Sequence, residues 1–172
     1  MKAVEIERKF LVKIEDIPSD YKKYKCSKLI QGFIYLKPVI RIRKADSDYI
    51  LTIKEKMIQK DKKLKDMVRK EYEFPISIKA FKYLSRFIQG RFIYKKRYFI
   101  PYRQGKKKYT IELDVFEKDY KGLIYAEVEF ESVREALNFK APSWFYKEVT
   151  NVSKYNNTSL SICKSPKSIL KY

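Results

Sequence analysis

Short stretches of this chain alternate a charged residue with an apolar or aromatic residue at every second position. The sharpest example is the run Glu5-Ile6-Glu7-Arg8-Lys9. Side chains at positions i, i+2 and i+4 share one face of a β-strand. Glu5, Glu7 and Lys9 are therefore expected side by side, with apolar residues on the opposite face. The pattern predicts a strand that has one charged face and one apolar face.

The same period recurs along most of the chain, and turn-forming residues such as Pro38 and Gly105 separate several of the stretches. The predicted strands cover residues 2–13, 27–37, 39–44, 49–58, 67–75, 91–100, 109–116 and 123–130. The lysine-rich segment 59–66 is expected to be a hairpin loop, and residues 101–107 a turn.

Helical periodicity replaces the two-residue period in two places. Apolar residues recur at helical spacing over residues 77–88 and predict an amphipathic helix with Ser77 as its N-cap. The run Ser132-Val133-Arg134-Glu135 fits a capping box and predicts a second, short helix that ends at Phe139. Short helices and irregular structure are expected after this point.

A charged face on one strand after another predicts closure of the sheet. A flat sheet would leave its long twisted edges unprotected, whereas a closed barrel removes the edges and places the charges inside. We predict an α+β fold, an eight-stranded, mostly antiparallel closed β-barrel that forms a tunnel, with a few helices packed outside. The alternative is a solvated sheet face with weak cross-strand ion pairs. The length of 172 residues predicts one domain, residues 1–172.

The proposed inner face carries acids and bases in almost equal number. The acids are Glu5, Glu7, Glu71, Glu73, Glu112, Asp114, Glu127 and Glu129, and the bases are Lys9, Arg41, Arg43, Lys54, Arg69, Lys95 and Arg97. Neighbouring carboxylates repel each other unless a cation lies between them, and carboxylate oxygens are the ligands that Mg²⁺ and Mn²⁺ prefer. Arginine and lysine bind phosphate oxygens. The two sets together predict a site for a metal–polyphosphate complex.

Composition narrows the chemistry further. With 40 basic and 21 acidic residues the net charge is +19, which favours an anionic partner. The absence of histidine excludes histidine-based triads and general bases. Cys26 and Cys163 match no metal-binding spacing, and the isolated glycines form no phosphate-binding loop. No apolar run is long enough to cross a bilayer, so we expect a soluble cytoplasmic protein without a membrane partner.

The ordered set of charged residues resembles the CYTH superfamily, also called triphosphate tunnel metalloenzymes. Glu5-x-Glu7-x-Lys9 resembles the family's N-terminal ExExK motif, and the later charged pairs follow in the family's order. The tail, Glu148-Val149-Thr150 followed by Tyr155-x-Asn157-x-x-Leu160, is similar to the ending of small bacterial inorganic tripolyphosphatases. One position departs from these relatives, since Lys154 stands where they often carry arginine.

The resemblance implies metal-dependent hydrolysis of a triphosphate, first of all inorganic tripolyphosphate to pyrophosphate and phosphate, with one or two Mg²⁺ or Mn²⁺ ions. The implied catalytic residues are Glu5, Glu7, Lys9, Glu127 and Glu129. The implied substrate-binding residues are Lys9, Arg41, Arg43, Lys54, Arg69, Glu71, Glu73, Lys95, Arg97 and Lys154. The implied metal ligands are Glu5, Glu7, Glu112, Asp114, Glu127 and Glu129.

Three alternatives remain open at the level of the sequence. The same fold could serve a class IV-type adenylate cyclase, which converts ATP to cAMP and pyrophosphate, or a thiamine triphosphatase. A non-catalytic module that binds polyphosphate or RNA is the third. Acids interleaved with bases would repel an extended polyanion, so the expected partner is a small triphosphate rather than a nucleic acid. The sequence is compatible with a monomer or a homodimer.

Overall fold

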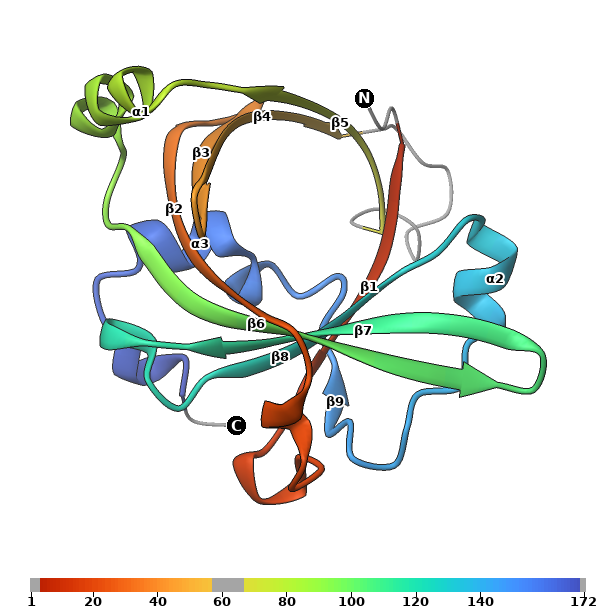
Figure 1. Cartoon of the computed structure of the whole chain (residues 1–172). Coiled ribbons are helices and arrows are strands. Elements are labelled where there is room, and N and C mark those ends of the chain that lie inside the picture. Colours follow the sequence, from red (N-terminus) through yellow and green to blue (C-terminus); the bar gives the residue numbers. More distant parts are fainter. Residues whose placement is uncertain (1–3, 57–66, 171–172) are drawn as a thin grey trace.

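The computed structural model describes residues 4–56 and 67–170, and within them the strands close into a barrel (Figure 1). They form one antiparallel sheet in the order β5-β4-β3-β2-β6-β7-β8-β1-β9, and β5 also pairs with β1. The strands are β1 (Glu5–Leu11), β2 (Cys26–Leu36), β3 (Val39–Ala45), β4 (Asp48–Lys56), β5 (Val68–Pro75), β6 (Ile93–Gln104), β7 (Lys107–Phe116), β8 (Ile124–Glu129) and β9 (Lys147–Glu148). The helices are α1 (Ile78–Leu84), α2 (Val133–Asn138) and α3 (Asn157–Ile162).

Strand β1 closes the barrel because it uses both of its edges. One edge pairs with β8 from Glu7 to Leu11. On the other edge, Glu5 and Ile6 pair with β5, whereas Phe10 and Leu11 pair with the short strand β9. The predicted eight-stranded closed barrel is confirmed, and β9 is an addition to it. Two residues are too few to show a period, so the sequence pattern carried no signal for β9.

The hairpin between β6 and β7 is longer than predicted. The prediction of a turn over residues 101–107 is wrong, because β6 continues to Gln104 and the turn consists of Gly105 and Lys106. Pro101 fits inside β6 because pairing with β2 ends at Tyr98, and Phe99 N donates to Lys25 O just beyond it. At Pro101, two residues beyond Phe99, no strand among the described residues pairs with this edge of β6. The N–H that proline lacks therefore costs no ladder hydrogen bond.

Helices α1 and α2 lie outside the barrel (Figure 1). Helix α1 is shorter than the predicted 77–88 and continues as a 3₁₀ turn over Ser85–Phe87. Both predicted N-caps are confirmed, since Ser77 Oγ accepts from Ala80 N at 3.1 Å and Ser132 Oγ accepts from Glu135 N at 3.2 Å. The predicted loop 59–66 lies outside the described residues. Within the described ranges, no helix is long and apolar enough to span a membrane.

Two apolar clusters flank the charged interior. The first lies on the outer face of β1, β7 and β8 and is covered by α2 and by Phe139 and Phe145. The second lies on the inner face. On β1, β6, β7 and β8 the inward-facing residues are charged along part of the strand and apolar at the end where this cluster lies. It includes Leu11, Ile93, Phe116 and Tyr125, against which the C-terminal segment packs Tyr155 and Leu160. The tunnel therefore has a polar section and an apolar floor at one end.

Candidate active site

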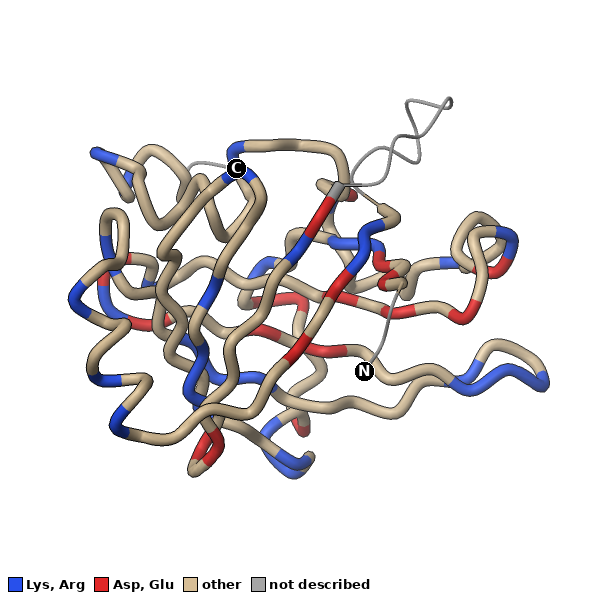
Figure 2. The backbone as a smooth tube through the Cα atoms, turned by 90° about the horizontal axis from the view of Figure 1, so that it is seen from above, with Lys and Arg blue, Asp and Glu red and all other residues tan. Residues whose placement is uncertain are grey.

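The polar section of the barrel is a cavity of about 880 Å³. The described strands bring acids and bases to this cavity from around the barrel. Figure 2 shows the acidic and basic positions along the backbone. Every predicted site residue lines the cavity except Asp114 and Lys154. The charged faces of separate strands are therefore brought together around one cavity. Helix α3 lies across one end of the barrel, where its residues also line the cavity (Figure 1).

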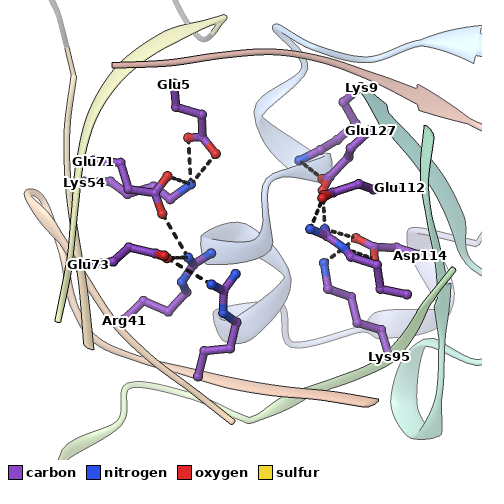
Figure 3. Close-up of polar contacts among 12 residues, drawn as sticks. Glu5, Lys9, Arg41, Lys54, Glu71, Glu73, Lys95, Glu112, Asp114 and Glu127 are labelled. Carbon is purple, nitrogen blue, oxygen red and sulfur yellow. Dashed lines mark hydrogen bonds and ion pairs between the residues drawn. The ribbon is translucent and has the colours of Figure 1, made fainter. Parts of the chain in front are cut away.

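Lys54 connects two carboxylates on the side of the barrel where β1 meets β5. Its Nζ lies 2.8 Å from Glu5 Oε2 and 2.8 Å from Glu71 Oε2 (Figure 3). Glu5 and Glu71 are both buried. Each of these charges has left water, and the pairing among three strands compensates part of that cost.

Two arginines of β3 continue this network. Arg41 Nη2 donates to Glu71 Oε1 at 3.2 Å and to Thr52 Oγ1 at 3.1 Å, and Arg43 Nη2 donates to Glu73 Oε1 at 2.9 Å. Burial, together with the neighbouring charge of Arg41, lowers the pKa of Arg43 to about 10. Burial raises the pKa of Glu73, but Arg43 and Arg41 outweigh it, so the net shift is downward. Both arginines line the cavity.

A second network occupies the opposite wall (Figure 3). Lys9 Nζ lies 3.0 Å from Glu127 Oε1. Arg97 contacts three carboxylates: its Nη2 donates to Glu127 Oε2 at 2.5 Å, its Nε and Nη2 donate to Asp114 at 2.7 Å, and its Nη1 donates to Glu112. Arg97 therefore links acids of β7 and β8, and its single positive charge offsets only part of their negative charge.

Asp114 is completely buried and lies behind the cavity wall. It accepts from Lys95 Nζ as well as from Arg97, to which it is directly opposite in the β6–β7 register. Burial lowers the pKa of Lys95, although Asp114 counteracts this effect. The position of Asp114 suits it to orient Lys95 and Arg97 toward the cavity.

The acids of this wall differ in their affinity for protons. Burial raises the pKa of Glu127, but Lys9, Lys95 and Arg97 outweigh it and hold that pKa well below the usual range. Burial and the charges of Glu127, Asp114 and Glu129 raise the pKa of Glu112 to about 7, despite Arg97. Negative charge is therefore crowded around Glu112.

The strand register explains this crowding. Glu7 lies directly opposite Glu129, and Glu112 lies directly opposite Glu127. Like charges in these positions repel each other, and a divalent cation would relieve the repulsion. No three carboxylates converge as a ready metal site within the described residues, where lysine and arginine hold several of their oxygens. The donor chemistry fits Mg²⁺ or Mn²⁺, and binding would require the carboxylates to exchange a basic partner for the ion.

Several residues that line the cavity were not predicted. The segment before and within α3 contributes Ser153, Asn156, Asn157, Thr158 and Ser159. Strand β2 contributes Gln31, the polar residue between Leu29 and Phe33 on the inner row. A polar residue between two inward-facing apolar residues was the signal available in the sequence. Because Gln31 is uncharged, it was not among the charged positions assigned to the inner face. The polar residues of the tail show no period from which their position could be read.

The structure does not bring Lys154 to the cavity. Its side chain is exposed, and its Nζ lies 4.7 Å from the centre of the Tyr155 ring. The residue before it and the polar residues after it line the cavity. The predicted substrate contact of Lys154 therefore has no geometric support among the described residues.

Comparison with known proteins agrees with the charged barrel. The CYTH domain matches residues 3–158. An inorganic triphosphatase of Nitrosomonas europaea is 32% identical over 167 residues, which cover 92% of this chain and 97% of that relative. An inorganic triphosphatase of Acetivibrio thermocellus is 30% identical over 160 residues, covering 91% of this chain and 92% of that relative.

Solved structures show the same architecture. The crystal structure of an inorganic triphosphatase superposes with a TM-score of 0.62 and 31% identity, covering 92% of this chain and 94% of its own. A protein from Pyrococcus horikoshii superposes with a TM-score of 0.53 and 23% identity, covering 75% of this chain and 79% of its own. The second likeness concerns the fold alone.

Proposed function

Because this chain belongs to the CYTH domain family, we propose that it catalyses metal-dependent hydrolysis of inorganic tripolyphosphate to pyrophosphate and phosphate. One observation carries the proposal: a cavity of about 880 Å³ is lined by lysines and arginines, which suit phosphate oxygens, together with carboxylates, which suit a divalent metal ion. The family relatives named inorganic triphosphatases support the choice of substrate. The same charges on an open sheet face would favour a binding surface instead.

The cations of the wall bind and neutralise the phosphate chain. Arginine forks and lysine ammonium groups match the oxygens of successive phosphoryl groups. The proposed phosphate-binding set is Lys9, Arg41, Arg43, Lys54, Arg69, Lys95 and Arg97. Glu71 and Glu73 hold Arg41 and Arg43 in place, and they enter the site as positioning residues rather than direct phosphate ligands.

The carboxylates on the side of the cavity formed by β1, β7 and β8 would hold one or two Mg²⁺ or Mn²⁺ ions. Glu7, Glu112, Glu127 and Glu129 form the crowded patch, and Glu5 lies beside it on β1. We assign Asp114 to the orientation of Lys95 and Arg97, since it lies behind the cavity wall. When bound, the ion supplies charge neutralisation of phosphate oxygens and activation of water.

Hydrolysis of a phosphoanhydride requires mainly positioning and electrostatic stabilisation. Arginines on β3 and lysines on β4 and β1 can hold the chain at several points, which fixes the terminal phosphoryl group relative to an attacking water. No covalent nucleophile is required, so the absence of histidine from the sequence is no obstacle. Burial of the charged wall strengthens its electrostatic effect on the transition state.

The test is phosphate release from tripolyphosphate, ATP and thiamine triphosphate, measured with Mg²⁺, with Mn²⁺ and in EDTA. We expect release that requires metal and prefers tripolyphosphate. A Glu5→Gln/Glu7→Gln variant should lose at least about a hundredfold in rate. Glu15→Gln, which alters an exposed carboxylate outside the cavity, is the matched control and should retain full activity. Metal-independent release, or release unaffected by the double substitution, would contradict the proposal.

A nucleoside triphosphate is the second candidate substrate. Part of the cavity lining is apolar, with Leu36, Val39, Ile50 and Ile162 beside the charged walls. This lining could contact a base, which inorganic tripolyphosphate does not have. Analysis of the products formed from ATP distinguishes the chemistries, since a cyclase gives cAMP and pyrophosphate, whereas a hydrolase gives ADP and phosphate.

A further inference from the structure

Gln31 is a buried amide on the inner row of β2. Its side chain lines the cavity, and the residue is 1% exposed. Its neighbours on the same row, Leu29 and Phe33, are apolar and offer no acceptor. Within the described part of the chain, the Gln31 Nε2 group has no hydrogen-bond partner. A buried donor of this kind destabilises the protein unless an acceptor reaches it.

Two further donors with the same property lie on the adjacent strand. Gln31 is directly opposite Arg43 in the β2–β3 register, and Arg41 follows two positions along, opposite Phe33. The Nε atoms of Arg41 and Arg43 are buried and have no acceptor among the described residues. The Nη2 atoms of the same guanidinium groups are occupied by Glu71 and Glu73. Three buried N–H groups on neighbouring strands thus lack acceptors beside one cavity.

We propose that Gln31 is a substrate-binding residue whose Nε2 donates to a phosphate oxygen that Arg41 and Arg43 also bind. This inference rests on the proposed function and adds a neutral contact to its charged set. A phosphoryl group brings several acceptor oxygens, which matches a cluster of donors without acceptors. An uncharged amide suits this wall, because Leu29 and Phe33 supply no carboxylate that would balance another cation.

The test compares Gln31→Leu, which keeps a similar volume and removes the donor, with Leu29→Met on the same inner row as matched control. Thermal unfolding is measured without ligand, and tripolyphosphate binding is measured by calorimetry in EDTA. For Gln31→Leu we expect a higher melting temperature and about tenfold weaker tripolyphosphate binding. Leu29→Met should leave binding within about twofold of the wild type.

A structural role for Gln31 predicts the opposite result. Loss of a useful internal hydrogen bond would lower the melting temperature of Gln31→Leu and leave the tripolyphosphate affinity unchanged, and this outcome would overturn the inference. Gln31→Glu is a second test variant. A carboxylate at this position would repel phosphate, so this substitution should weaken tripolyphosphate binding more than Gln31→Leu does.

Hydrolysis is measured separately on the wild-type protein with Mg²⁺, so that the two proposals can fail independently. Binding without hydrolysis, together with weaker binding by Gln31→Leu, would reject the proposed function and keep the inference. Hydrolysis with equal affinity and equal KM in Gln31→Leu would reject the inference and keep the function. Absence of both binding and hydrolysis in the wild type would reject both.

Discussion

At the scale of single residues, the interior is a set of charges that neutralise each other. Lys54 holds Glu5 and Glu71, and Arg97 holds acids of β7 and β8. Such pairs offset the cost of burying charge, but apolar residues would fill the same space at lower cost. A wall of buried ion pairs is therefore better explained by a ligand that exchanges with them than by stability alone.

Removal of Lys54 tests this balance. In Lys54→Met the buried carboxylates of Glu5 and Glu71 lose their shared cation, so we expect the free energy of unfolding to fall by about 3 kcal/mol. Urea titration measures the change. Lys70→Met, on an exposed position of β5, should change stability by less than about 0.5 kcal/mol. Equal effects of the two substitutions would show that the internal pairs contribute little.

At the scale of elements, α3 covers one end of the barrel because the backbone approaches it closely at Gly90. Gly90 has a φ of 76°, and a Cβ at this position would collide with the carbonyl of Ser161 in α3. Arg91 N donates to the same carbonyl at 2.9 Å. Glycine is therefore required by the conformation and by the contact, and the contact holds in place a helix that lines the cavity.

Gly90→Ala should separate these two requirements when it is compared with Gly105→Ala. Gly105 also has a positive φ, of 58°, but an added Cβ there meets open space. We expect a loss of about 1 kcal/mol in Gly105→Ala from backbone strain, and about 2 kcal/mol more in Gly90→Ala from overpacking. Urea unfolding measures both losses. The KM for tripolyphosphate should rise in Gly90→Ala only, since α3 lines the cavity.

Arg8 joins three elements on the outer side of β1. Its guanidinium donates to both carboxylate oxygens of Glu148 in β9, at 2.9 and 2.6 Å, and to the carbonyls of Ala136 and Phe139 at the end of α2. Burial raises the pKa of Glu148, but hydrogen bonds from Arg8 and Thr150 outweigh it, so this pKa is lowered from its ordinary value of 4.5.

A lowered carboxyl pKa stabilises the folded protein at pH values above 4.5, and the contribution disappears as the pH falls through the folded-state pKa. Glu148→Gln should therefore be about 0.5 to 1 kcal/mol less stable than the wild type at pH 7, a modest value because the carboxylate is partly exposed. The difference should shrink as the pH falls below 4.5 and vanish once the pH is below the folded-state pKa of Glu148. A difference in unfolding free energy that is independent of pH would show that packing, rather than the ion pair, is responsible.

At the scale of the whole molecule, the positive charge exceeds what the cavity needs. The net charge is +19, whereas acids and bases within the cavity nearly balance. Basic positions are spread over the strands and the connections (Figure 2). A protein with this distribution attracts small polyanions over a distance set by the Debye length, about 10 Å at 0.1 M salt.

The salt dependence of the rate follows from this long-range attraction. Raising the salt from 50 to 300 mM should reduce kcat/KM for tripolyphosphate by about tenfold, because association loses its electrostatic steering. The kcat at saturating substrate should change by less than about twofold, since buried contacts are screened much less. Steady-state rates at several salt concentrations test this, and a fall in kcat equal to that in kcat/KM would contradict it.

The sequence by itself determined the strands, their charged faces and the closure of the barrel. The reason is that strand periodicity is local. Within each run of about five to ten residues, the two-residue period determines which side chains share a face. Once strands with a charged face are numerous, closure follows from the need to protect sheet edges. Most of the charged residues that line the cavity, from Glu5 to Glu129, could be listed on this basis, whereas Gln31 and the lining residues of the C-terminal segment could not.

Only the tertiary structure decided which charges meet. Pairing of Lys54 with Glu5 joins residues 49 positions apart, and it depends on the register of β1 against β5. The same non-local contacts created the strand β9, moved Asp114 behind the wall, left Lys154 outside the cavity and brought Gln31 beside Arg43. None of these has a periodic signal, because each depends on the closure of the barrel and on where the C-terminal segment packs.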